Sequence, residues 1–157
     1  MSQIEPPQNR RVNLRAIIFK NGKLFCQKLK ASHTLHDNEF WCTPGGGIEF
    51  GESLHEGLAR EIIEETGVKP VIGNLLFIQQ FMDGEREQLE FFFHVTNADD
   101  YDTLDLANTS HGDIEVAECG FVDPKTTVIK PDFLMTVDLE DAITSSSPIR
   151  IAYDGKL

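Results

Sequence analysis

Three glutamates near the middle of the 157-residue chain have a spacing suited to chemistry. Glu61, Glu64 and Glu65 stand at positions i, i+3 and i+4, which on a helix lie on one face within about a quarter-turn. Their like charges repel one another, and Arg60, the only base nearby, cannot neutralise all three. Mg²⁺ binds proteins through a few carboxylate oxygens together with substrate phosphates. A helix with this face is therefore a platform for divalent cations, unless the face is simply solvated.

Local signals around these glutamates predict the helix that must carry them. Ser53 and Glu56 have the spacing of a capping box, which places the start of the helix at Ser53. Gly67 is a typical C-terminal stop, so the sequence predicts a helix over residues 53–66. The apolar residues that should pack against a sheet recur every four positions: Leu54, Leu58 and Ile62.

The glutamates belong to a longer pattern that runs through residues 46–68. The segment reads GGIEFGESLHEGLAREIIEETGV and matches G-x5-E-x7-R-E-U-x-E-E-x-G-U, in which U is aliphatic. Its fixed residues are Gly46, Glu52, Arg60, Glu61, Glu64, Glu65 and Gly67, and its aliphatic residues are Ile62 and Val68. Seven fixed identities would arise by chance at roughly one in a billion starting points, and the match is therefore specific. On these residues the chain resembles the Nudix hydrolases.

The resemblance implies a fold and an activity. Nudix hydrolases are α/β/α sandwiches with a mixed β-sheet, and they use Mg²⁺ or Mn²⁺ to cleave a nucleoside diphosphate linked to a further moiety. The Trp-x-x-Pro-Gly-Gly lead-in and the hairpins on either side of the box also resemble the family. We therefore expect a nucleotide pyrophosphohydrolase that acts on phosphoanhydride bonds.

The resemblance also implies roles for the charged residues of the box. Glu61, Glu64 and Glu65 would be catalytic metal ligands, in agreement with their shared helical face. Glu52 and Arg60 would form a supporting pair that holds the loop against the helix, and a direct contact of Glu52 with the metal stays open. The general base would be one of the box glutamates or a carboxylate from a later loop.

Substrate-binding residues are expected in two places. Gly46 and its neighbour Gly47 would let the chain pass close to the metal site, in conformations closed to residues with a Cβ. Lys28, near the end of the second strand, stands where relatives place a basic phosphate contact, and Arg15 is an alternative. Either base could equally be a simple surface charge.

A further metal ligand is expected after the box. Glu115 lies six residues before Phe121, in a place where relatives often carry a metal-facing glutamate. The alternative is a solvated loop residue, because the segment from residue 97 to 118 holds seven acids and no Lys or Arg. Glu118 is the nearest competitor for the same role.

The elements that must position these residues are visible in outline. Residues 1–9 are expected to be a flexible lead-in, and residues 10–157 a single mixed α/β domain. Asn21-Gly22 between two apolar runs predicts a hairpin of residues 11–20 with 23–30. Further expectations are a hairpin of 71–82 with 88–95 around Asp83-Gly84, an exposed loop over 97–113, a strand near 114–122 and a helix near 132–143.

The charge of the chain narrows the class of protein. The formal net charge of −12 comes from 14 basic and 26 acidic residues, and the box accounts for −5 and residues 97–118 for −7 of it. Eleven phenylalanines argue against a disordered acidic tail. The acid excess argues against general binding to a nucleic-acid backbone. The box share is explained as the charge of a Mg²⁺ site without its metal.

Other sequence features bear on location and substrate. No signal peptide, membrane-spanning run or paired cysteine spacing is visible, so we expect a cytoplasmic protein without a membrane partner. A homodimer is common among relatives and stays open. The marker residues of ADP-ribose and dinucleoside polyphosphate hydrolases are missing, for example at Asp83, which favours a small nucleotide such as a nucleoside triphosphate or nucleotide sugar. The alternatives are those two hydrolase classes, a catalytically silent nucleotide-binding regulator, and a hydrolase of capped or 5′-triphosphate RNA, which the acidic balance disfavours and the basic N-terminal segment leaves open.

Overall fold

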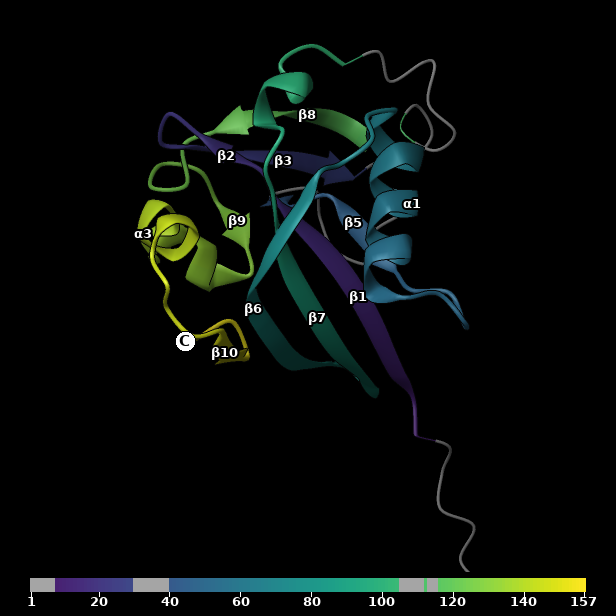
Figure 1. Cartoon of the computed structure of the whole chain (residues 1–157). Helices are drawn as coiled ribbons and strands as arrows, with labels where there is room; N and C mark the ends of the chain where they lie inside the picture. The colour runs from purple at the N-terminus through teal and green to yellow at the C-terminus, as the bar shows by residue number, and fades with distance from the viewer. Residues whose placement is uncertain (1–7, 30–39, 105–111, 113–115) are drawn as a thin grey trace, which may run out of the picture.

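The structure is a computed structural model that describes residues 8–29, 40–104, 112 and 116–157, so most of the expected lead-in lies outside it. Five strands form a mixed sheet, sheet A (Figure 1). In spatial order they are β10 (Arg150–Tyr153), β6 (Ile72–Asp83), β7 (Arg86–Val95), β1 (Arg10–Ile17) and β5 (Gly45–Gly47). β1 runs parallel to β7 and antiparallel to β5. Residues 13–15 of β1 therefore lie beside the three glycines of β5.

A second sheet, sheet B, is built around strand β3 (Lys23–Leu29), which pairs with three of its other strands. Its strands are β2 (Phe19–Lys20), β3 (Lys23–Leu29), β4 (Trp41–Cys42), β8 (Val116–Val122) and β9 (Ile129–Lys130). The expected turn at Asn21-Gly22 is confirmed, with φ of 51° and 74°, as a type I′ hairpin turn requires. The expected first arm is divided, however: only β2 pairs with β3, while residues 10–17 pair with β7. The turn residues determine where the chain reverses direction, but they do not determine that residues 10–17 pair with β7.

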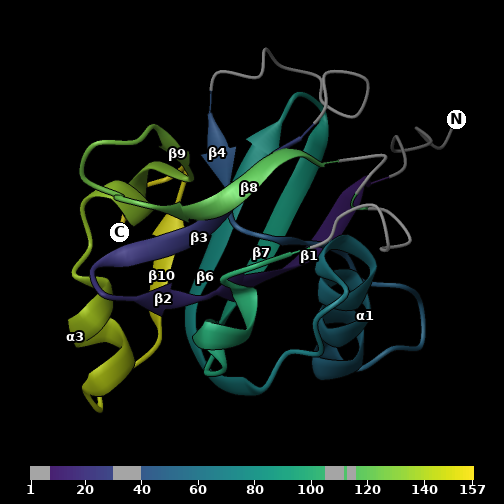
Figure 2. The same cartoon turned by 90° about the horizontal axis from the view of Figure 1, so that it is seen from above.

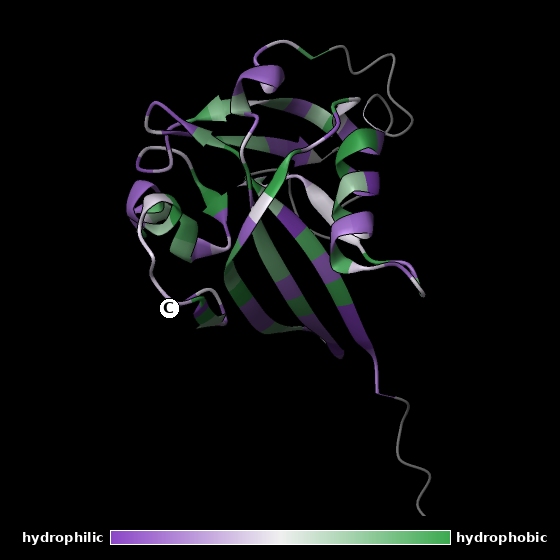
Figure 3. Cartoon of the chain, in the orientation of Figure 1, coloured by the Kyte–Doolittle hydropathy of each residue, from purple (hydrophilic) through white to green (hydrophobic). Residues whose placement is uncertain are grey.

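The second hairpin and the helix of the box agree with the sequence. β6 and β7 pair antiparallel across a two-residue turn that begins at Gly84, whose φ is 62°. Helix α1 spans Leu54–Thr66, with Ser53 as its N-cap and Gly67 as its C-cap. Figure 3 shows hydrophobic and hydrophilic residues alternating along β1, β6 and β7, which is the pattern of strands with two different faces.

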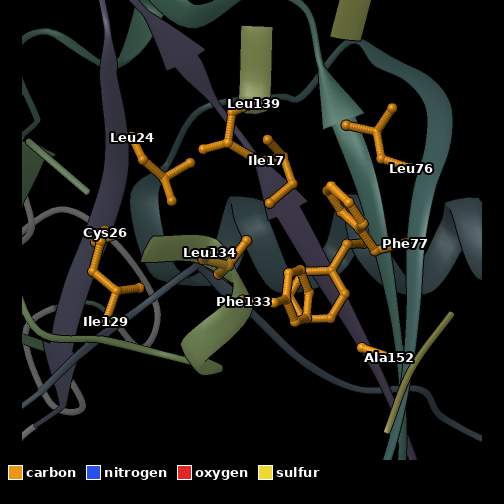
Figure 4. Packing of buried hydrophobic residues seen from close by; sticks show 11 residues of the cluster. Ile17, Leu24, Cys26, Leu76, Phe77, Ile129, Phe133, Leu134, Leu139 and Ala152 are labelled. Carbon is orange, nitrogen blue, oxygen red and sulfur yellow. The ribbon is translucent and has the colours of Figure 1, made fainter. Parts of the chain in front are cut away.

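Sheet A carries a core on each face. Leu14 and Ala16 of β1 pack on the same side as Leu58 and Ile62 of α1, whereas Ile17 points into the opposite core. That opposite core also contains the residues shown in Figure 4, among them Phe77, Phe133, Leu134, Leu139 and Ala152. In Figure 2 helix α1 and the C-terminal helix α3 (Leu139–Thr144) lie on opposite sides of the strands. The arrangement is the expected α/β/α sandwich.

Three sequence expectations need correction. The helix expected over 132–143 is two pieces, a 3₁₀ helix (Asp132–Met135) and α3, because Asp138 caps a new helix by accepting a hydrogen bond from the Asp141 N–H. Strand β10 was not expected. The loop expected to be exposed over 97–113 begins with a 3₁₀ helix (Ala98–Tyr101). Tyr101 is only 2% exposed, and its ring centre lies 5.6 Å from that of Phe25. The strand expected near 114–122 is present as β8.

Two general features complete the description. All three cysteines are free thiols, as their spacing indicated. In the described part of the chain, no helix has the length and apolarity to cross a membrane.

Candidate active site

Helix α1 is held so that its acidic face has a fixed direction. The Ser53 hydroxyl accepts a hydrogen bond from the Glu56 N–H (3.1 Å), and the Glu56 carboxylate accepts one from the Ser53 N–H (2.9 Å). Leu58 and Ile62 are fully buried beneath the helix. Gly67 ends it in the left-handed region, with φ of 75°. The caps and the buried stripe together direct the glutamates of the last two turns toward the edge of sheet A.

Arg60 links the loop before α1 to the acidic face. Its guanidinium donates to both carboxylate oxygens of Glu52, at 2.6 and 3.0 Å, and to the Gly47 carbonyl at 3.1 Å. It also donates to Glu61 at 2.9 Å and to Glu64 at 3.3 Å. The hydrogen bonds from Arg60 lower the pKa of Glu52 to about 2. The sequence-predicted pair of Glu52 and Arg60 is therefore formed, with the geometry of a bidentate ion pair.

Glu65 has a different environment from the other two helix glutamates. It is 3% exposed and accepts hydrogen bonds from the Gly45 N–H (3.0 Å) and from the Gln27 side-chain amide (3.2 Å). Burial raises its pKa to about 8, although Arg15 and the hydrogen bonds from Gly45 and Gln27 favour the charged form. Glu65 therefore joins α1 to strand β5 and to sheet B.

The three glycines of β5 allow a close approach on both of its sides. A Cβ at Gly46 would lie 2.5 Å from Glu61 Oε2, and one at Gly47 would lie 3.1 Å from Arg11 Nε. A Cβ at Gly45 would lie 1.9 Å from the Leu14 carbonyl oxygen. Because these residues are glycines, the Glu61 carboxylate and the Arg11 guanidinium can both lie against the backbone of β5.

The site suits a hard divalent cation by its donor chemistry. Glu61, Glu64 and Glu65 offer only carboxylate oxygens, and the Glu61 carboxylate lies against the backbone of Gly46, where a Cβ would stand 2.5 Å from its Oε2. These are the donors that Mg²⁺ and Mn²⁺ prefer. As placed, the side chains do not converge: among the described residues no group of three His, Cys, Asp or Glu could hold an ion together. Arg60 contacts two of the three expected ligands instead.

A buried polar layer covers the other face of sheet A, and sequence reasoning missed most of it. Arg15 forms an ion pair with Glu90 (2.9 Å), whose other oxygen accepts a hydrogen bond from Gln79 (3.0 Å). Asn13 donates to Gln88 at 2.8 Å. The signal was present as polar residues at alternate positions of otherwise apolar strands. Arg15, one of the expected substrate contacts, is thereby engaged with Glu90.

The remaining expected site residues are placed as follows. Lys28 lies with its amino group 5.4 Å from the centre of the Trp41 ring, and in β3 it is paired with Glu118 of β8. Glu118 is exposed. Glu115 lies outside the described residues. Its metal role therefore stays a prediction.

Comparison with known proteins assigns the family. The model of the NUDIX domain matches residues 9–135, which include the box, β1 and the polar layer. The chain belongs to the Nudix family. The solution structure of the E. coli ORF135 protein has the same fold, with a TM-score of 0.66 and 19% identity over 90% of this chain and 96% of that one.

Two curated relatives share parts of this Nudix chain. A Bacillus subtilis (strain 168) protein with the provisional name 8-oxo-dGTP diphosphatase is 35% identical over 80 residues, which are 48% of this chain and 54% of that protein. Diphosphoinositol polyphosphate phosphohydrolase 2 of Rattus norvegicus is 39% identical over 56 residues, or 36% and 31% of the two chains. The chain therefore spans about half the length of the first relative and less of the second.

Proposed function

We propose that this Nudix protein is a Mg²⁺-dependent pyrophosphohydrolase that cleaves the diphosphate linkage of a small nucleotide, such as a nucleoside triphosphate or a nucleotide sugar. The observation that carries the proposal is the intact acidic face of α1 beside a strand of glycines. There Glu61 Oε2 lies so close to Gly46 that a Cβ would come within 2.5 Å of it. No side chain of β5 separates these carboxylates from a bound phosphate.

Each side chain of the site has a task in this proposal. Glu61, Glu64 and Glu65 hold the cation, with Glu115 as a further ligand. When bound there, Mg²⁺ would supply positive charge for the diphosphate oxygens and for the ionisation of the attacking water. Glu52 and Arg60 fix the loop against α1, and a box glutamate or Glu115 accepts the proton of the water.

The substrate is assigned to the other side of the glycine strand. We expect phosphate to approach the backbone of Gly46 and Gly47, with Lys28 as the expected basic contact, because the alternative, Arg15, is paired with Glu90. The names of the two relatives refer to different phosphate compounds, an oxidised nucleotide and a diphosphoinositol, so they do not favour one leaving group. The small-nucleotide preference rests on the missing marker residues. ADP-ribose and dinucleoside polyphosphates are the competing substrates.

A panel of nucleotides tests the proposal. We expect the protein with Mg²⁺ to release a nucleoside monophosphate from at least one nucleoside triphosphate, nucleotide sugar, ADP-ribose or dinucleoside polyphosphate. Replacing Glu64 by Gln should lower kcat by at least about 100-fold, because a carboxylate that binds metal or accepts the proton is lost. Glu140→Gln is the matched control, since this exposed glutamate lies on α3, far from the box.

The outcomes separate the hypotheses. Full turnover in excess chelator, or in both Glu64→Gln and Glu61→Gln, contradicts the metal mechanism. Tight nucleotide binding without turnover of any compound supports the silent regulator instead. The circular dichroism spectra of the variants should match that of the original protein, so that lost activity is not lost folding.

A further inference from the structure

Arg11 occupies an unusual place at the edge of the site. In β1 it points to the same face as Asn13 and Arg15, away from α1, because Leu14 and Ala16 fill the core beneath the helix. Its guanidinium lies directly over Gly47, with Nε and Nη2 at 3.1 and 3.2 Å from the position of a Cβ there. A Cβ at position 47 would require the guanidinium to shift by a few tenths of an ångström.

Arg11 has no partner among the described residues. No carboxylate there lies within ion-pair distance of its guanidinium, and none of its N–H groups donates a hydrogen bond to them. By contrast, Arg10 is paired with Glu87 at 2.9 Å and Arg15 with Glu90 at 2.9 Å. Arg11 is an exposed residue, but desolvation of its guanidinium, followed by the charges of Arg15 and Arg86, lowers its pKa, while the charges of Glu61 and Glu90 raise it. The N–H groups of Arg11 are thus available to hydrogen-bond an incoming anion.

The two sides of the glycine strand carry opposite charges. Strand β5 lies between α1 and β1 in Figure 1, and successive residues of a strand face opposite sides of its sheet. On one side Glu61 adjoins Gly46, and on the other Arg11 adjoins Gly47. A diphosphate whose one phosphoryl group carries bound cations would be attracted through those cations to Glu61. Its other phosphoryl group would be attracted to Arg11.

We infer that Arg11 binds a phosphoryl group of the substrate, on the side of the glycine strand opposite the glutamates of α1. The inference rests on the proposed function and assigns a phosphate-binding residue to it. A guanidinium can donate two parallel N–H···O bonds to a phosphate, which gives direction as well as charge. Arg15, the base expected from the sequence, is already engaged by Glu90, whereas Arg11 is free to bind.

Binding of a diphosphate that cannot be hydrolysed tests the inference directly. The probe is methylenediphosphonate with Mg²⁺, titrated calorimetrically into the original protein, Arg11→Gln and Arg11→Lys. Arg10→Gln is the matched control, because it removes an equal charge from the neighbouring exposed position of β1. We expect Arg11→Gln to raise the Kd by roughly 10- to 100-fold, the range of a lost charge-assisted hydrogen bond. Arg11→Lys should fall between, and Arg10→Gln within about twofold of the original protein.

Kinetics and stability distinguish a binding role from a structural one. On the nucleotide that is hydrolysed, Arg11→Gln should raise KM by a similar factor and change kcat by less than about threefold. Its thermal midpoint should equal or exceed that of the original protein, since repulsion from Arg15 and Arg86 is relieved.

The failure of this inference is separable from the failure of the proposed function. If nucleotides are hydrolysed but Arg11→Gln binds the probe as well as Arg10→Gln does, Arg11 is a solvated surface charge and the inference is wrong. If no nucleotide is hydrolysed but the probe binds and depends on Arg11, the phosphate site stands without the activity. If the original protein does not bind the probe at all, the inference is overturned.

Discussion

Glu64 and Glu65 are adjacent in the chain, yet their carboxylates have different surroundings. The side chain of Glu64 is 23% exposed, and its Oε2 lies 3.3 Å from Arg60 Nη1, so the two residues form an ion pair. The Glu65 carboxylate is buried and takes hydrogen bonds from the Gly45 N–H and the Gln27 amide. Helical spacing places both on one face, but only the neighbouring strands decide which of them is removed from water.

The raised pKa of Glu65 predicts a pH dependence of stability in the metal-free protein. Its folded value of about 8 lies above the ordinary value of 4.5, so between these pH values the folded state binds the extra proton. The stability contribution of Glu65 is therefore complete below about pH 4.5 and is lost as the pH rises through about 8, by at most about 1.4 kcal/mol per pH unit. We expect urea unfolding in chelator to show this decline in the original protein and in Glu140→Gln. Glu65→Gln should lack that component, and an equal slope in this variant would show that Glu65 does not titrate in this range.

Strand β5 is the element on which the site depends most closely. It has only the backbone of three glycines, with α1 on one side and β1 on the other. Gly45 has a φ of 142°, which disfavours an L side chain, and it donates its N–H to Glu65. The strand therefore positions Glu65 of the helix, and Glu61 and Arg11 lie against its other two glycines.

Replacing Gly45 by alanine is expected to destabilise the protein. The new Cβ would lie 1.9 Å from the Leu14 carbonyl oxygen, so β5 must move away from β1. We expect a loss of roughly 2–4 kcal/mol in the free energy of unfolding, measured with urea. The control is Gly120→Ala in β8, where a Cβ meets no atom within 4 Å. Equal unfolding midpoints for the two variants would contradict the close contact.

Considered as a whole molecule, the protein assembles its site from both sheets and a helix. The carboxylates come from α1, the glycines from β5, the guanidiniums from β1, and Gln27 from β3 of sheet B. These contacts form only when the chain is folded, and in the proposed function a bound cation offsets the repulsion among the glutamates. A ligand that binds the folded state alone must therefore stabilise the entire domain.

Mg²⁺ is accordingly expected to raise the free energy of unfolding, by about 2.7 kcal/mol at a concentration one hundred times its Kd. Urea unfolding with and without millimolar Mg²⁺ measures the effect, and NaCl of equal ionic strength controls for screening. Glu61→Gln should lose most of the gain, while Glu140→Gln should keep it. A gain of the same size in all three proteins would indicate nonspecific charge screening of the acidic chain.

The local signals of the sequence predicted the parts of the fold that depend on neighbouring residues. Ser53, Glu56 and Gly67 defined α1, and Asn21-Gly22 and Gly84 defined two turns, because caps and tight turns are fixed by a few adjacent side chains and dihedral angles. Long-range pairing was not predictable in this way. No turn connects β1 to its parallel partner β7, and β10 joins β6 from the far end of the chain.

By itself the sequence determined the family pattern and the helix that carries the three glutamates, since these depend on residues close together in the chain. The pairing of Glu52 with Arg60 was implied by the family resemblance, and the structure contains it. The tertiary structure decided which glutamate is buried, that Arg15 is engaged by Glu90, and that Arg11 lies free over Gly47. Exposure, pKa and the choice of an ion-pair partner depend on which strands lie side by side. That arrangement is set by packing across the whole domain and is not encoded in local spacing.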